Sequence, residues 1–140
     1  MATDRYTPST ELPINWGILR HLHWGRVMAG GIGAELAVFA IVFPVLHFFG
    51  QTAFLASILV SSAALPFLFA LWVGRRVESH FVLHGLMVGV VAALMYVIVA
   101  WGQPEPLLYK VAHGLKLVGG LLGGVASAHR IAGDRARTSV

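Results

Sequence analysis

The sequence lacks cysteine and has little charge. Without cysteine, the chain can form no disulfide, no thiolate metal site and no thiol nucleophile. Charged residues make up 11% of the 140 residues, less than half of the roughly one quarter that is typical of soluble domains. The HExxH, phosphate-loop and nucleophile-elbow motifs do not occur. Because polar residues are too few to assemble a catalytic site, we do not expect an enzyme.

Apolar residues dominate instead, at 57% of the chain and a mean hydropathy of +0.77. Each of four apolar segments reaches the ~20 residues that cross a bilayer core. These segments are 27–49, 54–73, 81–101 and 107–128. The breaks between them are short and carry turn residues. Because short connections make neighbouring helices antiparallel, we expect an all-α, four-transmembrane-helix bundle made of two helical hairpins.

Three regions follow from this division: an N-terminal segment 1–23, a membrane domain 24–129 and a basic tail 130–140. In the first, Leu12, Trp16 and Leu19 fall on one side of a possible short helix, which suits a segment lying at the headgroup level. An ordinary flexible terminus with one tryptophan anchor fits equally well. We find no pattern of a removable signal peptide.

The net charge of +4 comes from basic residues at segment ends rather than from one patch, so we do not expect nucleic acid as a partner. In the four-span arrangement the arginines all fall on one side: Arg5, Arg20, Arg26, Arg75, Arg76, Arg130, Arg135 and Arg137. The other side has only Lys110 near a helix end. The positive-inside rule therefore predicts that both termini are cytoplasmic.

Glycines recur at helical spacing in the apolar segments. Helices in lipid associate by close packing, which favours small residues at their contacts. We expect packing or partner-interface faces at Gly30, Gly33, Gly85, Gly89, Gly119, Gly120, Gly123 and Gly124. Packing within the bundle is the simpler interpretation, and contact with another subunit is the alternative, because GxxxG steps do not identify their partner helix.

Two charged residues lie deep inside apolar segments. Glu35 falls roughly 12 Å from one membrane boundary and Lys116 roughly 13 Å from the other, so their depths nearly match. An unpaired charge costs ~2.5–3.5 kcal/mol at mid-membrane. We therefore predict a Glu35–Lys116 ion pair, and an inward polar stripe on the last helix that contains His113, Lys116 and Ser127. The pair could be a structural lock or part of a proton relay or substrate site.

Histidines offer a weaker alternative. His84 lies four residues after His80 on one helix face, and His47 and His113 both fall in the outer half of the four-span arrangement. Haem or bacteriochlorophyll ligation at His47, His84 and His113 is geometrically conceivable, but interfacial histidine is ordinary and no second ligand set is recognisable. We predict no cofactor and no metal.

Three segments carry a resemblance: WGRVMAGGIGAELAVFAIVFPV, VLHGLMVGVVAALMYVIVAWGQP and YKVAHGLKLVGGLLGGVASAHR. They resemble small four-helix bacterial integral membrane proteins of uncharacterised function, over roughly Trp24 to Arg130. The resemblance implies a bacterial inner-membrane location and brings no activity.

The leading interpretation is a non-catalytic accessory or scaffold subunit of a larger inner-membrane assembly, respiratory or photosynthetic, whose partners are lipid and other integral membrane subunits. The alternatives are a small homo-oligomeric proton or ion transporter that uses Glu35, Lys116 and His113, and a haem- or chlorophyll-associated subunit.

Overall fold

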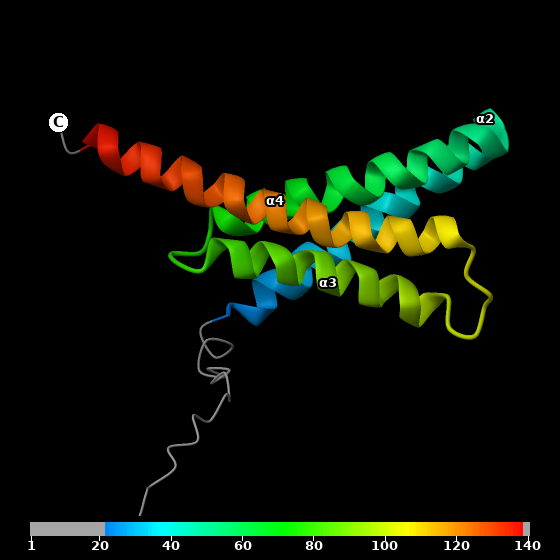
Figure 1. The fold of residues 1–140 in the computed structure, drawn as a ribbon, viewed down its shortest axis with the longest axis horizontal. Coiled ribbons are helices and arrows are strands. Elements are labelled where there is room, and N and C mark those ends of the chain that lie inside the picture. The colour runs from blue at the N-terminus through cyan, green and yellow to red at the C-terminus, as the bar shows by residue number, and fades with distance from the viewer. Residues whose placement is uncertain (1–21, 139–140) are drawn as a thin grey trace, which may run out of the picture.

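The computed structural model describes residues 22–138. Within that range the chain forms three α-helices and no strand. These are α2 (Trp24–Gly74), α3 (Phe81–Val99) and α4 (Leu107–Thr138), which run side by side in Figure 1. The expectations for Leu12, Trp16 and Leu19 lie outside the described residues.

The predicted four-helix bundle is wrong in its number of helices. The segments expected at 27–49 and 54–73 belong to one helix, α2, which is 51 residues long. The predicted break does contain a departure from helical geometry, but only at Gly50, whose φ is 80° and ψ −175°. Helical structure resumes directly after it. A single glycine therefore replaces the loop that the turn residues Phe49-Gly50-Gln51-Thr52 predict, and the all-α class stands with three helices.

The bend at Gly50 folds α2 back on itself. A straight helix of this length would extend over roughly 77 Å, far beyond the ~30 Å of a bilayer core. We call residues 24–49 the first arm and residues 51–74 the second arm. Val38 and Val42 of the first arm share a buried cluster with Ile58 of the second, and Figure 1 shows α2 turning at one end of the molecule and returning. The two arms pack against each other.

The other two helices end at different points from those predicted. α3 ends at Val99, two residues before the predicted end, and a turn with Gly102 at a φ of 76° follows. α4 continues to Thr138, ten residues past the predicted end at 128. The predicted tail 130–140 is therefore helical through 138. The charges that end the apolar pattern do not end the helix, because arginine and alanine are good helix formers.

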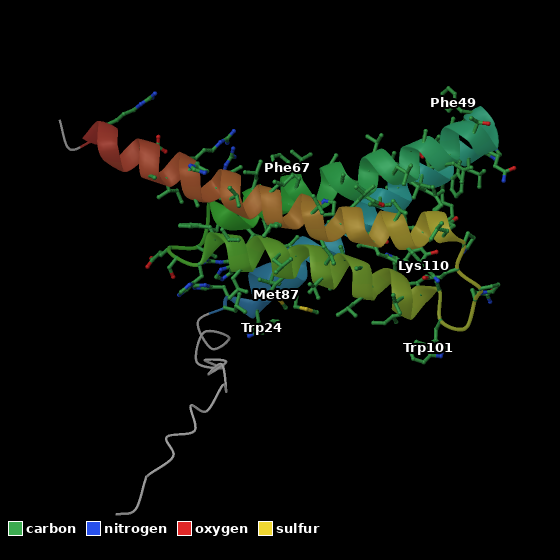
Figure 2. The ribbon with its side chains drawn as sticks, in the orientation of Figure 1. Trp24, Phe49, Phe67, Met87, Trp101 and Lys110 are labelled. Carbon is green, nitrogen blue, oxygen red and sulfur yellow. The ribbon has the colours of Figure 1, made fainter. Side chains whose placement is uncertain are left out.

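Charge and aromatic residues mark the two ends of the molecule. Trp24 lies toward one end, whereas Phe49, Trp101 and Lys110 lie toward the other (Figure 2). The end that carries Trp24 also carries the α2–α3 connection and the last turns of α4 (Figure 1). Arg26 lies in the first turn of α2, Arg75 and Arg76 in the α2–α3 connection, and Arg130 and Arg137 in the last turns of α4.

The outer surface of the bundle is apolar. Phe48, Val60 and Leu94 are among the large hydrophobic side chains that are more than half exposed. α2, α3 and the apolar part of α4 are long and apolar enough to cross a membrane. This confirms the coarser prediction: the helices suit a membrane protein with lipid against its surface.

Candidate functional site

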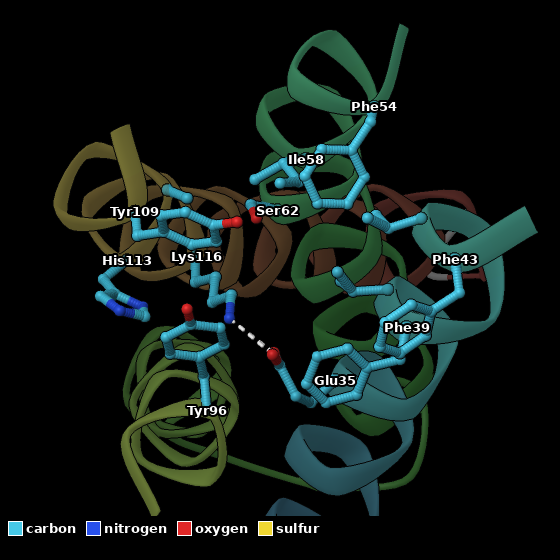
Figure 3. A pocket seen from close by; sticks show the side chains of 13 residues that line it. Glu35, Phe39, Phe43, Phe54, Ile58, Ser62, Tyr96, Tyr109, His113 and Lys116 are labelled. Atoms are coloured by element: carbon cyan, nitrogen blue, oxygen red, sulfur yellow. Dashed lines mark hydrogen bonds and ion pairs between the residues drawn. The ribbon is translucent and has the colours of Figure 1, made fainter. Parts of the chain in front are cut away.

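A buried ion pair joins the first arm of α2 to α4 (Figure 3). The Lys116 ammonium donates a hydrogen bond to Glu35 Oε1 at 2.8 Å, and Nζ lies 2.7 Å from Oε2. Glu35 is 1% exposed and Lys116 is 2% exposed. The structure thus brings together Glu35 and Lys116, the two residues whose similar membrane depth predicts that they pair.

Lys116 also faces an aromatic ring. Its Nζ lies 5.0 Å from the centre of the Tyr96 ring on α3, within the distance at which a cation is attracted to a ring face. The ammonium therefore contacts groups on both other helices. The sequence gives no sign of Tyr96, because its position depends on how α3 is rotated about its axis.

A cavity of about 200 Å³ adjoins the ion pair. Its walls come from both arms of α2, from α3 and from α4 (Figure 3). The lining residues are Glu35, Val38, Phe39, Val42, Phe43, Phe54, Ile58, Ser62, Tyr96, Tyr109, Ala112, His113 and Lys116. Most of this lining is apolar, and the charged pair forms one polar side of it.

Polar and aromatic groups continue from the ion pair toward the α3–α4 loop. The Tyr96 ring lies 4.8 Å from the His113 ring and 5.6 Å from the Tyr109 ring, between centres. His113 Nε2 lies 3.4 Å from Glu105 Oε1 in that loop. Tyr109 and Glu105 are not among the residues that the sequence predicts for this site, although Tyr109 and His113 are four residues apart, a spacing that places two side chains on one helix face.

Three buried polar atoms at the cavity have no hydrogen-bond partner among the described residues: Ser62 Oγ, His113 Nδ1 and Glu35 Oε2, of which Oε2 has Lys116 Nζ as its ion-pair partner at 2.7 Å. The neighbouring Ser61 differs, because its hydroxyl donates to the Ser57 carbonyl at 2.5 Å. A buried hydroxyl without a partner costs free energy. Ser62 is therefore a group that an occupant of the cavity could satisfy.

The predicted glycine faces lie inside the bundle. A Cβ on Gly119 or Gly123 would overlap a backbone carbonyl of the second arm of α2, and one on Gly120 or Gly124 would overlap the α3 backbone. On the facing helices, Gly85 and Gly89 meet α4, and Gly30 and Gly33 meet side chains of the second arm and of α3. These glycines thus allow the helix backbones of this chain to approach one another closely.

The polar stripe of α4 faces the same interior. Ser127 is 3% exposed, and its hydroxyl donates to the Gly123 carbonyl at 2.9 Å. It also packs against Gly74, where a Cβ would overlap its side chain. Together with Lys116 and the partly buried His113, it forms one inward face of the helix.

The structure does not bring the three candidate cofactor ligands together in one site. His84 has both ring nitrogens engaged, because Nε2 accepts from the His23 backbone N–H at 3.1 Å and Nδ1 lies 2.9 Å from the His80 carbonyl oxygen. His47 is exposed beside Phe48 near the Gly50 bend, and His113 lies at the cavity. Haem or bacteriochlorophyll ligation at these histidines stays a prediction.

A second hollow lies on the outside of the bundle, between the second arm of α2 and α4. It is lined by Val60, Ala63, Ala64, Phe67, Val118, Gly119 and Leu122. All seven residues are apolar, and its small residues, Ala63, Ala64 and Gly119, sit among larger side chains. We call this feature the outer groove.

Among residues 22–138, no group of three or more histidine, aspartate or glutamate side chains is placed to hold a metal ion. Comparison of the chain with protein-family models, with curated proteins and with solved structures finds no match. The resemblance to small bacterial membrane proteins therefore stays a prediction.

Proposed function

We propose that this chain is a non-catalytic accessory or scaffold subunit of a larger bacterial inner-membrane assembly, of the respiratory or photosynthetic type. Its role in this proposal is to pack against another integral membrane subunit. The two loops between the helices are short, and the polar side chains that are deepest in the helices are turned inward. The lipid-facing surface is therefore the part of the described chain that is available to a partner.

The outer groove is the observation that carries this proposal. Membrane helices pack where small residues let backbones approach, and the exposed Ala64 with the half-buried Ala63 provides such a position on the outside of the bundle. The spaced glycines Gly85 and Gly89 of α3 and Gly119, Gly120, Gly123 and Gly124 of α4 are already in close contact with other helices of this chain. We assign the groove to one transmembrane helix of a partner subunit.

The proposal includes an orientation. The arginines of the described helices and loops lie at one end of the molecule, and the positive-inside rule places such an end in the cytoplasm. The Gly50 bend and the α3–α4 loop then face the periplasm. The C-terminal turns of α4 are cytoplasmic in this orientation.

Extraction of a tagged chain from the membranes of its own host, in mild detergent, tests the proposal. Native-gel sizing and mass spectrometry should find another membrane protein in stoichiometric amount. Ala64→Leu fills the outer groove and should abolish this co-purification. Ala40→Leu is the matched control, because Ala40 is also an exposed alanine of α2 but lies outside the groove. A chain that purifies alone, or equal loss with both variants, contradicts the proposal.

A proton or ion transporter is the second candidate, favoured by the polar groups that lead from the Glu35–Lys116 pair through Tyr96 and His113 to Glu105. This route covers only one half of the bundle. Toward the arginine-bearing end, Gly85 and Gly120 approach backbone to backbone, and Val27, Val73 and Val88 are fully buried. A transporter would need another arrangement to open this half.

Liposomes that contain the purified chain and a pH-sensitive dye distinguish the two candidates. Transport predicts a proton flux that Glu35→Gln abolishes and that Glu78→Gln, at an exposed loop residue, leaves intact. The scaffold proposal predicts a flux no greater than that of empty liposomes.

A further inference from the structure

We propose that the cavity beside the Glu35–Lys116 pair binds a small apolar molecule that carries a ring carbonyl, such as the headgroup of a membrane-dissolved quinone. The proposal does not depend on the scaffold function. It rests on the size of the cavity, the hydrogen-bonding character of its polar side and its access to lipid.

Size favours a single ring. The cavity measures about 200 Å³, and an apolar cavity of about 150 Å³ is enough to hold benzene. Phe39, Phe54 and Ile58 contribute flat or branched apolar walls. One substituted ring fits this space, whereas a long chain would have to remain largely outside.

The polar groups favour a ligand that accepts hydrogen bonds. Glu35 Oε1 accepts a hydrogen bond from the Lys116 ammonium at 2.8 Å, and Oε2 lies 2.7 Å from Nζ as an ion pair without a hydrogen bond. The Ser62 hydroxyl is 1% exposed, lines the cavity and has no partner. An ammonium has three N–H donors, and the Tyr96 and Tyr109 hydroxyls border the same space (Figure 3). The ammonium and the three hydroxyls therefore bring more donors to the cavity than the two atoms able to accept that have no hydrogen bond, Glu35 Oε2 and His113 Nδ1, which suits a carbonyl oxygen.

Access comes from the lipid side. Phe43 lines the cavity, yet it is 62% exposed on the outer surface of the bundle. The cavity thus reaches the surface at an apolar position of the first arm, between Glu35 and the Gly50 bend. A ring could enter there while an attached apolar tail stayed in the bilayer. A lipid ester offers the same carbonyl chemistry from a second source.

Binding to the full chain in nanodiscs tests this site, with empty nanodiscs subtracted. The probes are 2,3-dimethoxy-5-methyl-1,4-benzoquinone, the carbonyl-free ring 3,4-dimethoxytoluene and the ester methyl octanoate. Equilibrium dialysis gives the affinities, and the recovered protein mass checks that no covalent adduct has formed. Ser62→Ala should weaken benzoquinone binding about three- to ten-fold, since it removes one hydrogen-bond donor. Ser61→Ala is the matched control, because Ser61 is buried and already paired.

Ala112→Leu tests the location separately. Ala112 is 3% exposed and lines the cavity, so a larger side chain there should prevent binding while the helix content stays unchanged. Tighter binding of the benzoquinone than of the ester, with sensitivity to Ser62→Ala, supports the ring carbonyl. The reverse order, with the same sensitivity, assigns the site to a lipid ester carbonyl. No binding, equal binding of the carbonyl-free ring, or insensitivity to both cavity variants overturns the proposal.

Discussion

At the residue scale, the bundle is organised around one acid and one base that neutralise each other. Glu35 and Lys116 are almost fully buried, and each is the other's charged partner within hydrogen-bond distance. Removal of one member of a buried pair leaves an uncompensated charge, which is more costly than the loss of the attraction itself. The pair therefore favours the arrangement of α2 and α4 in which Glu35 and Lys116 are in contact, because any other arrangement leaves a buried charge unpaired.

Lys116→Met should destabilise the folded bundle by about 3–5 kcal/mol, because it leaves the Glu35 carboxylate buried without its cation. Lys110→Met is the control, since Lys110 is an exposed lysine six residues before Lys116 on the same helix, and surface substitutions usually stay within about 0.5 kcal/mol. Unfolding in mixed detergent micelles measures both. Equal stability of the two variants would show that Lys116 is not buried in an ion pair with Glu35.

Much of this pair could be predicted from the sequence, whereas the cavity could not. Rise per residue and bilayer thickness fix the depth of Glu35 and Lys116, so matching depths identify them. Tyr96 and Ser62 join the same site only through the rotation of α3 and the fold of α2. The sequence does not predict that rotation, because these segments are hydrophobic all the way around the helix and no polar face marks which side is buried.

At the element scale, the main difference from the predicted structure is the single-residue bend of α2. Gly50 has a φ of 80° and a ψ of −175°, a conformation that is essentially restricted to glycine. The sequence Phe49-Gly50-Gln51-Thr52 indicates a reversal at this point, and a reversal occurs. It does not reveal that the helix resumes at once, since the same residues are equally suited to a short loop.

Gly50→Ala should destabilise the bundle by about 1–3 kcal/mol through backbone strain alone, because nothing lies within 4 Å of an added Cβ. Gly25→Ala is the matched control: it also has open space around its Cβ, but its φ is not positive, so the change should be neutral or slightly stabilising. The measurement is the free energy of unfolding in detergent. A harmless Gly50→Ala would argue against the positive φ.

Gly120→Ala should also destabilise the bundle, by about 1–3 kcal/mol, because its Cβ would overlap the Gly85 carbonyl oxygen and force α3 and α4 apart. Gly114→Ala on the same helix has no neighbour within 4 Å and should be neutral or gain up to about 1 kcal/mol from helix propensity. Thermal unfolding followed by circular dichroism compares them. Similar midpoints for both variants would contradict the close contact of these two helices.

At the scale of the whole molecule, charge is distributed between two unlike ends. Arg26, Arg75, Arg76 and Arg130 occur at one end, and Glu105 and Lys110 lie near the other. The sequence predicts this asymmetry well, since it requires only the order of apolar segments and basic residues. It predicts the number of helices poorly, because the bend at Gly50 and a short loop differ in only a few backbone angles, and the same turn residues suit both.

The absence of native cysteine makes the orientation directly measurable. Gln103→Cys and Ser79→Cys both replace exposed residues, in the α3–α4 and α2–α3 loops. In intact cells, a membrane-impermeant maleimide should label Gln103→Cys and leave Ser79→Cys unlabelled until the membrane is opened. The opposite pattern would place the arginine-bearing end outside the cytoplasm.

The most direct test of the account is a double-mutant cycle on the ion pair in a lipid environment. The variants are Glu35→Gln, Lys116→Met and the two combined, with the free energy of unfolding measured for each. If the two side chains meet as the structure has them, the double variant should be less destabilised than the sum of the single variants, by about 1–3 kcal/mol. Strict additivity would mean that Glu35 and Lys116 do not pair, and would contradict both the described packing of α2 on α4 and the polar side of the cavity.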